Sequence, residues 1–450
     1  MTEHDLPGSL FCDVDAYVER HEQDLVALVQ GLVRFDTTSV DLSPGSEHRE
    51  NEEAACQAFA ADELRASGCE IDQWEPDARE LQRHPMMPPW HHWEDRPITV
   101  GTLRGAGGGR SLIINGHIDV VNAGDPSLWS VPPFSAEIRD GRIVGRGSLD
   151  MKGGIAAAMF ALRALKACDI RLAGDLIFEV VTDEETCAMG TIAAIERGYR
   201  ADAGLVPEPT DMNLWVATRG ILHGSVRIEG RSAHAEINQP SWQAGGGVNA
   251  IEKAAKVIGA LAELSEEWSG REDKRHPLLG VPAIHPTLIR GGAFIANIPE
   301  SCELGINTTY LPHNADASGF GSVPKGEIEA AVARVAEADE WLALHPPRWT
   351  WATDYPPCQF DPGTPIIDVA RRAAQAIGRQ TIVEGLDSAY DGALLTQFAD
   401  TPSPAWGPGE TERAHTTDES IGIDEVVQCA RLYARAIVDW CGLAGGGRAM

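Results

Sequence analysis

The sequence has few basic residues and few aromatic ones, and it lacks long apolar runs. Its 37 Lys and Arg face 67 Asp and Glu, which gives a formal net charge of -30. Because nucleic-acid binding relies on basic patches, this balance argues against a phosphate-backbone partner. A membrane-spanning helix needs about 18 or more consecutive apolar residues, and no such run occurs. Glu3 and Asp5 stand where a secretory signal would have basic residues, so no signal is predicted.

Paired cysteines are also lacking. The nine cysteines are odd in number and none has C-x-x-C spacing. This favours reduced, buried thiols over a disulfide framework or a cysteine zinc site. Together with the missing signal, it predicts a cytoplasmic protein. Cys187 follows a run of acids, although a small core residue is the simpler interpretation.

The chain is long enough for two domains, because 450 residues exceed what one hydrophobic core usually organises. Short apolar runs that end in polar residues predict buried strands of an α/β sheet at Ser111–Asn115, Leu176–Thr182 and Ala203–Val206. Helical spacing of apolar residues predicts helices at Val14–Phe35, Asn51–Ser67, Gly153–Lys166, Thr364–Ile377 and Asp424–Cys441.

The pattern changes from about Thr218. Strand and helix patterns then occur at Leu222–Gly230, Gly247–Leu264, Pro286–Ile289 and Cys302–Tyr310. They predict an α+β insert with its own sheet and helices on one face. We interpret the Pro- and Trp-rich stretch His345–Pro357 as the linker back to the first domain. This predicts one domain from residues 1–217 with 357–450, and an inserted domain at 218–356.

Polar residues follow the first two predicted strands. His117 and Asp119 are two apart in an extended segment and therefore face the same way. The run Asp183-Glu184-Glu185 follows the second strand, and adjacent carboxylates held together need a compensating cation. The alternatives are a polar strand end with a hydrogen-bonded histidine and a solvated turn.

Three further segments offer similar side chains. Asp150 lies between glycines just before a helix, where an N-cap is the alternative role, although glycines on both sides indicate close backbone approach. Glu208 is stiffened by flanking prolines, and His415 follows a Gly-Pro-Gly turn. Two imidazoles and at least three carboxylates suit zinc, or cobalt and manganese. If one carboxylate bridged two ions, five ligands would serve a two-metal hydrolytic site.

These segments resemble a known family in order and spacing over roughly the whole chain. GHIDVV, GRGSLDMKGG, TDEE, PEPT and GPG followed by AHTTDE look like the metallo-amidohydrolases. That family contains acetylornithine deacetylase, succinyl-diaminopimelate desuccinylase, aminoacylase and the glutamate carboxypeptidases (carboxypeptidase G). The resemblance implies a zinc-peptidase-like α/β catalytic domain, with a mixed sheet between helices. It also implies an inserted α+β lid and dimerisation domain, two divalent metal ions and a homodimer through the lid.

The resemblance also implies roles for individual residues. The implied metal ligands are His117 and Glu208 for one ion, Glu185 and His415 for the other, and Asp150 for both. Asp119 would orient His117 through its other ring nitrogen. A metal-bridging water would attack the amide carbonyl, with Glu184 as the general base.

The insert matches the family's substrate side in part. His234 resembles the lid histidine that stabilises the oxyanion, and Asn297 the asparagine that faces the substrate. A surface histidine and a buried turn asparagine are the alternatives. Many relatives carry an aspartate and an arginine where this chain has Asn307 and Thr309. Without that arginine a substrate α-carboxylate is in doubt, unless Arg219 or Arg290 replaces it.

We therefore expect hydrolysis of a linear amide in a small N-acylated amino acid or a related compound. Alternatives are a dipeptidase or carboxypeptidase, and a hydrolase of an N-formyl, N-carbamoyl or aromatic amine substrate. An inactive metal-binding homologue is a further alternative, but the chain keeps Glu184 and every implied ligand. Asp391 is expected to support the site structurally, and the His84–Trp93 loop to lie near the pocket mouth.

Overall fold

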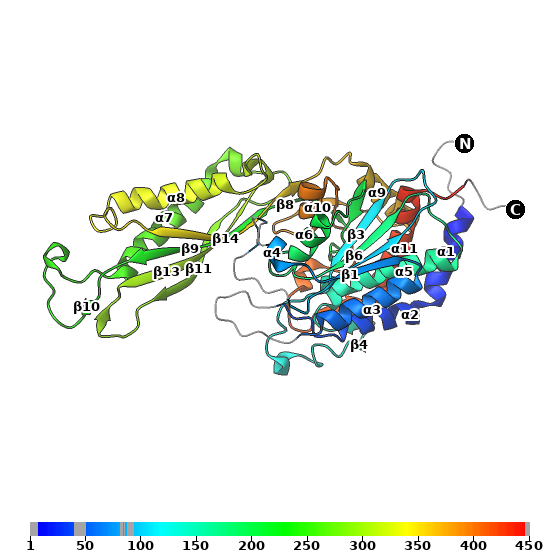
Figure 1. The fold of residues 1–450 in the computed structure, drawn as a ribbon, viewed down its shortest axis with the longest axis horizontal. Coiled ribbons are helices and arrows are strands. Elements are labelled where there is room, and N and C mark those ends of the chain that lie inside the picture. The colour runs from blue at the N-terminus through cyan, green and yellow to red at the C-terminus, as the bar shows by residue number, and fades with distance from the viewer. Residues whose placement is uncertain (1–7, 40–50, 82–83, 85, 88–93, 446–450) are drawn as a thin grey trace. The chain divides into compact units, whose positions relative to one another are not determined.

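The computed structural model describes residues 8–39, 51–81, 84, 86–87 and 94–445. The chain divides into two compact units. Unit 1 comprises Met1–Val216, Phe360–Glu384 and Tyr390–Met450, and unit 2 comprises Ala217–Gln359 and Gly385–Ala389. Figure 1 labels many of the helices and strands of both units.

Unit 1 is built from helices around a five-stranded sheet, and it also has a smaller sheet. Its helices are α1 (Gly8–Arg20), α2 (Glu22–Val33), α3 (Glu53–Ala66), α4 (Ala78–Leu81), α5 (Gly153–Ala167), α6 (Met189–Glu196), α9 (Pro365–Ala376), α10 (Gly392–Ala399) and α11 (Ile423–Cys441). Its strands are β1 (Glu70–Trp74), β2 (Ile98–Leu103), β3 (Leu112–His117), β4 (Glu137–Arg139), β5 (Arg142–Val144), β6 (Leu176–Val181), β7 (Ala203–Leu205) and β17 (Ser420–Gly422). The smaller sheet has the order β17-β5-β4. The strands β8 (Leu214–Thr218) and β16 (Val383–Leu386) cross the bounds between the units.

The main sheet of unit 1 is mixed, with strand order β1-β2-β6-β3-β7. β3 runs parallel to β6 and β7, whereas β2 is antiparallel to β1 and β6. Every residue of β3 and β6 is buried, which explains why these strands are apolar runs without alternation. Because β3, β6 and β7 are parallel, their carboxyl ends meet at one edge, where an α/β sheet places its functional groups.

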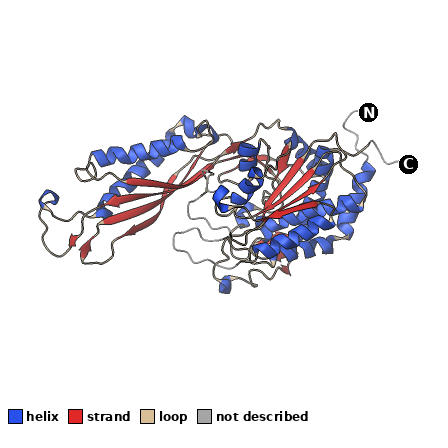
Figure 2. Ribbon diagram, viewed as in Figure 1, coloured by secondary structure: helices blue, strands red, loops and turns tan. Residues whose placement is uncertain are grey.

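Helices cover both faces of this sheet (Figure 2). α5 contacts β3 and packs on α11, while α6 contacts β6 and packs on α10. Right-handed crossovers require this arrangement, because the chain moves from β3 to β6 and then back past β3 to β7. The prediction of a mixed sheet between helices is confirmed.

Unit 2 has an antiparallel sheet of order β11-β13-β9-β14, with helices on one face. Its elements are β9 (Gly220–Glu229), β10 (Ala233–His234), α7 (Ala250–Gly270), β11 (Ile284–Gly291), β12 (Asn297–Ile298), β13 (Ser301–Tyr310), α8 (Ser322–Glu337), β14 (Arg348–Tyr355) and β15 (Cys358–Gln359). β13 alternates strictly between buried and half-buried residues, and its buried side joins α7 and α8 in one apolar core.

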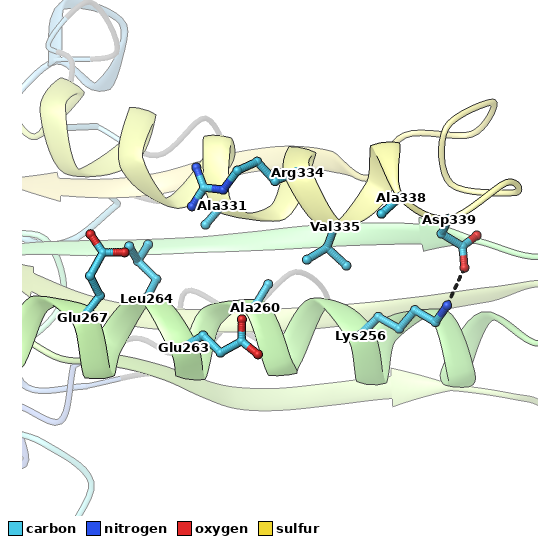
Figure 3. A pocket seen from close by; sticks show the side chains of 10 residues that line it. All are labelled: Lys256, Ala260, Glu263, Leu264, Glu267, Ala331, Arg334, Val335, Ala338 and Asp339. Carbon is cyan, nitrogen blue, oxygen red and sulfur yellow. Dashed lines mark hydrogen bonds and ion pairs between the residues drawn. The ribbon is translucent and has the colours of Figure 1, made fainter.

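A shallow groove of about 390 Å³ runs between α7 and α8 (Figure 3). Its floor holds small and apolar side chains, among them Ala260 and Ala331, and charged side chains line its rim. At one end Lys256 Nζ lies 2.7 Å from Asp339 Oδ2. The small side chains allow the two helices to pack closely over the sheet.

Two expectations about secondary structure were wrong. The stretch His345–Pro357 is not a linker, because it contains β14, which pairs with β9 at the edge of the sheet in unit 2. The strand was missed because prolines flank it on both sides and because it has too few aliphatic residues to indicate a strand. The helix predicted at Val14–Phe35 is two helices, α1 and α2, which are separated at His21.

No helix in the described part of the chain is long and apolar enough to cross a membrane. Most of the His84–Trp93 loop lies outside the described residues. His84 itself is described, and its ring meets the ring of Phe398 edge-on at 5.1 Å.

A buried carboxyl group in the middle of β6 makes stability depend on pH. Burial raises the pKa of Glu179 to about 8, although Asn115 donates a hydrogen bond to it at 2.9 Å. The unfolded chain loses this proton near the ordinary pKa of 4.5, so the folded state binds more protons between that pH and about 8. Stability contributed by the neutral carboxyl is therefore fully present below the unfolded pKa and falls as pH rises through this window.

We expect Glu179→Gln to weaken this loss, because the amide stays neutral. In urea unfolding from pH 5 to 8, the wild-type free energy of unfolding should fall by up to about 1.4 kcal/mol per pH unit more than that of the variant. Glu196→Gln, at an exposed position of α6, is the control and should follow the wild type. Parallel curves for Glu179→Gln and the wild type would contradict the assignment.

Candidate metal centre

His117 ends β3 with one ring nitrogen engaged and the other aimed at carboxylates. Its Nδ1 lies 2.9 Å from the backbone oxygen of Asp119. Its Nε2 lies 3.3 Å from Asp150 Oδ1, 3.9 Å from a Glu208 oxygen and 4.0 Å from a Glu184 oxygen. Within the described chain this buried Nε2 has no hydrogen-bond partner. An orphaned imidazole nitrogen facing carboxylates is an arrangement that a cation completes.

Asp150 lies between the two histidines. Its Oδ1 is 3.3 Å from His117 Nε2, and its Oδ2 is 3.3 Å from His415 Nε2. Glu185 Oε1 lies 3.2 Å from the same nitrogen of His415. His117, Asp150 and Glu185 present donor atoms that all lie within 4.8 Å of one another. One carboxylate with an oxygen toward each imidazole has the geometry that a bridging ligand needs.

Close backbone packing brings these segments together. A side chain on Gly154, at the start of α5, would clash with the backbone of Pro207 in the segment that carries Glu208. Gly147 has a φ of 79° just before the Asp150 turn, a conformation that favours glycine. The glycines around Asp150 therefore permit the close approach that the sequence indicated.

The carboxylates crowd together, and their pKa values show the electrostatic cost. Burial, followed by the charges of neighbouring carboxylates, raises the pKa of Glu184 and of Glu208 well above the ordinary value. Hydrogen bonds that the His415 ring donates to the carboxylates of Asp150 and Glu185 raise the pKa of His415 to about 10. A divalent cation would relieve this repulsion. Imidazole nitrogens and carboxylate oxygens are the donor set of zinc in hydrolytic sites, so the residues fit such an ion.

Asp119 contacts other groups besides the ring of His117. Its Oδ1 accepts the backbone N–H of Glu184 at 3.2 Å, and its Oδ2 accepts that of Glu185 at 3.1 Å. Ser39 Oγ also donates to Oδ2 at 2.8 Å. The sequence predicted the link to His117, but not the link to the loop that carries both glutamates.

Arg146 and Glu419 are two supporting residues that the sequence analysis missed. They form an ion pair, and both are almost fully buried. Glu419 Oε1 also accepts the backbone N–H groups of Leu149 at 3.0 Å and Asp150 at 3.2 Å. Glu419 follows His415 by four residues, so the pair ties the Asp150 turn to the His415 loop. Arg146 stands inside the motif GRGSLDMKGG, and Glu419 stands inside AHTTDE. Their place in these motifs is the signal by which the sequence could have identified them.

Asp391 and Cys187 are buried next to this centre. Asp391 Oδ2 accepts a hydrogen bond from Thr191 Oγ1 at 2.7 Å, and Thr191 in turn accepts one from Asn115. Cys187 Sγ lies 2.9 Å from Asp183 Oδ2. Burial raises the pKa of the Cys187 thiol well above its ordinary value, so Cys187 is a core thiol that donates a hydrogen bond.

In unit 2, His234 and Asn297 are neighbours. They pair directly across β10 and β12, and both are exposed. Thr309, at the position of the missing arginine, accepts a hydrogen bond from Arg219 Nη1 at 3.4 Å. Arg219 is mostly buried, and its Nη2 lies 2.9 Å from Asp387 Oδ1. The guanidinium nearest Thr309 is thus already paired with a carboxylate.

Comparison with known proteins gives one family. Residues 113–439 match peptidase family M20/M25/M40. An N-formyl-4-amino-5-aminomethyl-2-methylpyrimidine deformylase of Halalkalibacterium halodurans is 31% identical over 95% of this chain and 97% of its own length. A probable succinyl-diaminopimelate desuccinylase of Staphylococcus epidermidis is 28% identical over 72% of this chain and 81% of its own length.

A solved structure has the same fold. The crystal structure of a dinuclear metal binding peptidase of Bacillus subtilis superposes with a TM-score of 0.61. It covers 93% of this chain and 98% of its own, at 16% sequence identity.

The pair between Arg146 and Glu419 leads to a prediction about metal affinity. Glu419→Gln removes a charge-assisted bond and loosens the Asp150 turn, so we expect metal affinity to fall about 10–100-fold. Competition with a chelating dye measures this. Glu425→Gln is the control, because Glu425 lies on α11 and faces Arg142 and the backbone N–H of Gly422. Equal affinity in the wild type and Glu419→Gln would contradict the supporting role.

Proposed function

This chain belongs to peptidase family M20/M25/M40, and from that premise we propose that it hydrolyses a linear amide bond in a small N-acylated compound. The observation that carries the proposal is Asp150, whose two oxygens face His117 and His415 beside Glu184. The family, the donor set and the activities for which the relatives are named all support a metal-dependent hydrolase that acts on carbon–nitrogen bonds.

We assign two divalent cations to the centre, with zinc in keeping with the donor set and cobalt or manganese as alternatives. The proposed ligands are His117 and Glu208 for one ion, Glu185 and His415 for the other, and Asp150 for both. When bound, such a pair of ions supplies polarisation of the amide carbonyl and activation of a water molecule. The B. subtilis dinuclear peptidase supports the count of two.

Glu184 is the proposed general base. It takes a proton from the attacking water and returns it to the nitrogen of the leaving amine. Asp119 fixes the backbone N–H of Glu184 and also contacts His117, so it keeps the base and the metal ligand in one frame. We assign the oxyanion hydrogen bond to His234, with Asn297 beside it on the substrate side, and propose unit 2 as the lid that carries both.

An N-formyl amine, in particular a formylated heteroaromatic amine, is the proposed substrate. The 31% identical relative is named as a deformylase of an aminopyrimidine. Thr309 cannot hold a carboxylate as an arginine does, and Arg219 is paired with Asp387. N-acylated amino acids and dipeptides are therefore the second choice. The nine cysteines include no C-x-x-C pair, in keeping with the cytoplasm as the proposed compartment.

We further propose a homodimer in which the β11 strands of two copies pair. β11 is an edge strand, and seven of its eight residues are exposed. Leu288 and Ile289 are 41% and 56% exposed there. A long exposed edge strand with apolar side chains tends to pair with another chain, and a second copy supplies an identical edge.

Replacing Ile289 tests the dimer. Ile289→Lys places charges at the proposed pairing edge and should give a monomer mass in sedimentation analysis, whereas the wild type gives twice that mass. Ile382→Lys is the matched control, because Ile382 is 61% exposed outside β11, and this variant should keep the dimer. A wild-type monomer would contradict the proposal.

Glu184→Ala tests the chemistry. We expect turnover to fall by at least about 100-fold, since general-base catalysis contributes that much or more, while the metal content measured by mass spectrometry stays near that of the wild type. Glu196→Ala, at an exposed position on α6, should change neither. Parallel loss of metal in Glu184→Ala would mean that the roles of Glu184 and Glu185 are exchanged.

A substrate panel tests the reaction class. Metal-loaded protein is incubated with N-formyl, N-acetyl, N-succinyl and N-carbamoyl compounds and with dipeptides, and amine release is followed. The highest kcat/KM is expected for a formylated aminopyrimidine. No turnover of any amide would overturn the proposed function.

A further inference from the structure

A buried charge triad of Glu53, Arg96 and Asp183 lies behind the loop that carries the two glutamates. The side chains of these residues are 0%, 3% and 0% exposed. Arg96 donates to both oxygens of Glu53, from Nε at 2.7 Å and from Nη2 at 3.2 Å. Its Nη1 donates to Asp183 Oδ1 at 2.8 Å. One guanidinium thus connects α3, the segment before β2 and the loop after β6.

Asp183 has a backbone conformation that needs support. Its φ of 75° lies in the left-handed region, which is strained for a residue other than glycine. Such conformations persist where the surroundings over-determine them. Both carboxylate oxygens are fixed, because Thr186 Oγ1 donates to Oδ1 at 2.6 Å and Cys187 Sγ donates to Oδ2 at 2.9 Å. The turn at Asp183 therefore depends on how its side chain is held.

The residue after this turn is Glu184. The backbone N–H groups of Glu184 and Glu185 donate to Asp119, whereas Arg96 donates to the side chain of the preceding Asp183. The loop is held at two points, by Asp119, which follows the end of β3, and by Arg96 through Asp183. A buried ion pair seldom stabilises a fold more than apolar side chains of the same volume do, but a bidentate guanidinium fixes geometry.

We propose that Arg96 is a positioning residue: through Asp183 it sets the place of Glu184 and Glu185, and it contacts neither substrate nor metal ion. Its effect on turnover rests on the proposed function, whereas its effect on the loop does not. Nothing in the sequence motifs marks Arg96, because it stands alone in the segment Asp95–Pro97, far along the chain from the residues it holds.

The chain offers a matched control in the pair of Arg435 with Asp15. Arg435 is 7% exposed, and it binds Asp15 through both terminal nitrogens, at 2.6 Å and 2.5 Å. This pair joins α1 to α11, two helices that lie outside residues 182–188 in the sequence. Replacing Arg435 therefore removes a bidentate ion pair of the same kind without disturbing that loop.

The experiment compares Arg96→Lys and Arg96→Met with Arg435→Lys and Arg435→Met. Hydrogen exchange of peptides covering residues 182–188 is followed by mass spectrometry in the metal-free protein, and kcat and KM in the metal-loaded protein. For Arg96→Met we expect exchange at least about tenfold faster in these peptides and kcat about 10–100-fold lower, with KM within about threefold. Arg96→Lys should show the same changes to a smaller extent, because an ammonium cannot reproduce the planar guanidinium contacts.

The Arg435 variants should lower the unfolding temperature but leave loop exchange and kcat unchanged. If Arg96→Met does not fold, the exchange and kcat of Arg96→Lys decide whether Arg96 positions the loop. Wild-type exchange at 182–188 together with wild-type kcat in Arg96→Lys would overturn the inference. A wild-type protein that turns over no amide would overturn the proposed function instead, and the exchange of the metal-free protein would still decide the role of Arg96.

Discussion

Repulsion between carboxylates at one end of a sheet is the constraint on which the rest of unit 1 depends. Asp150, Glu184, Glu185 and Glu208 converge on His117 and His415, although each brings a negative charge into a place with little water. Side chains placed this way would move apart unless the backbone held them. The parallel strands β3, β6 and β7, the glycines around Asp150 and the ion pairs behind the loops all serve that need.

The sequence predicted those parts of the molecule that depend on local patterns. Apolar runs without alternation marked β3, β6 and β7, because buried strands must be apolar on both faces. Polar residues after those runs marked most of the site, and the structure brings His117, Asp150, Glu185 and His415 together. Residue identity and spacing along the chain carried this information.

What the sequence did not predict depends on contacts between distant segments. Arg96 reaches Asp183 across 87 positions, and Arg146 reaches Glu419 across 273. No spacing rule connects such pairs before the fold is known. β14 was missed for another reason, because its tryptophans and threonines stand between proline pairs and resemble a loop in composition. In unit 2 the pairing of Arg219 with Asp387 likewise depends on the fold. Because Arg219 is already engaged by this carboxylate, it does not simply replace the arginine that many relatives carry at the position of Thr309.

Asp119 connects the loop that carries Glu184 and Glu185 with the ring of His117. One carboxylate accepts the amides of Glu184 and Glu185, and the carbonyl of the same residue contacts the ring of His117. Residues that share a partner in this way do not contribute independent increments of free energy. The effects of substitutions at positions 117, 119 and 184 will therefore not add. Only a double-mutant cycle can measure how much of the rate belongs to each residue and how much to their coupling.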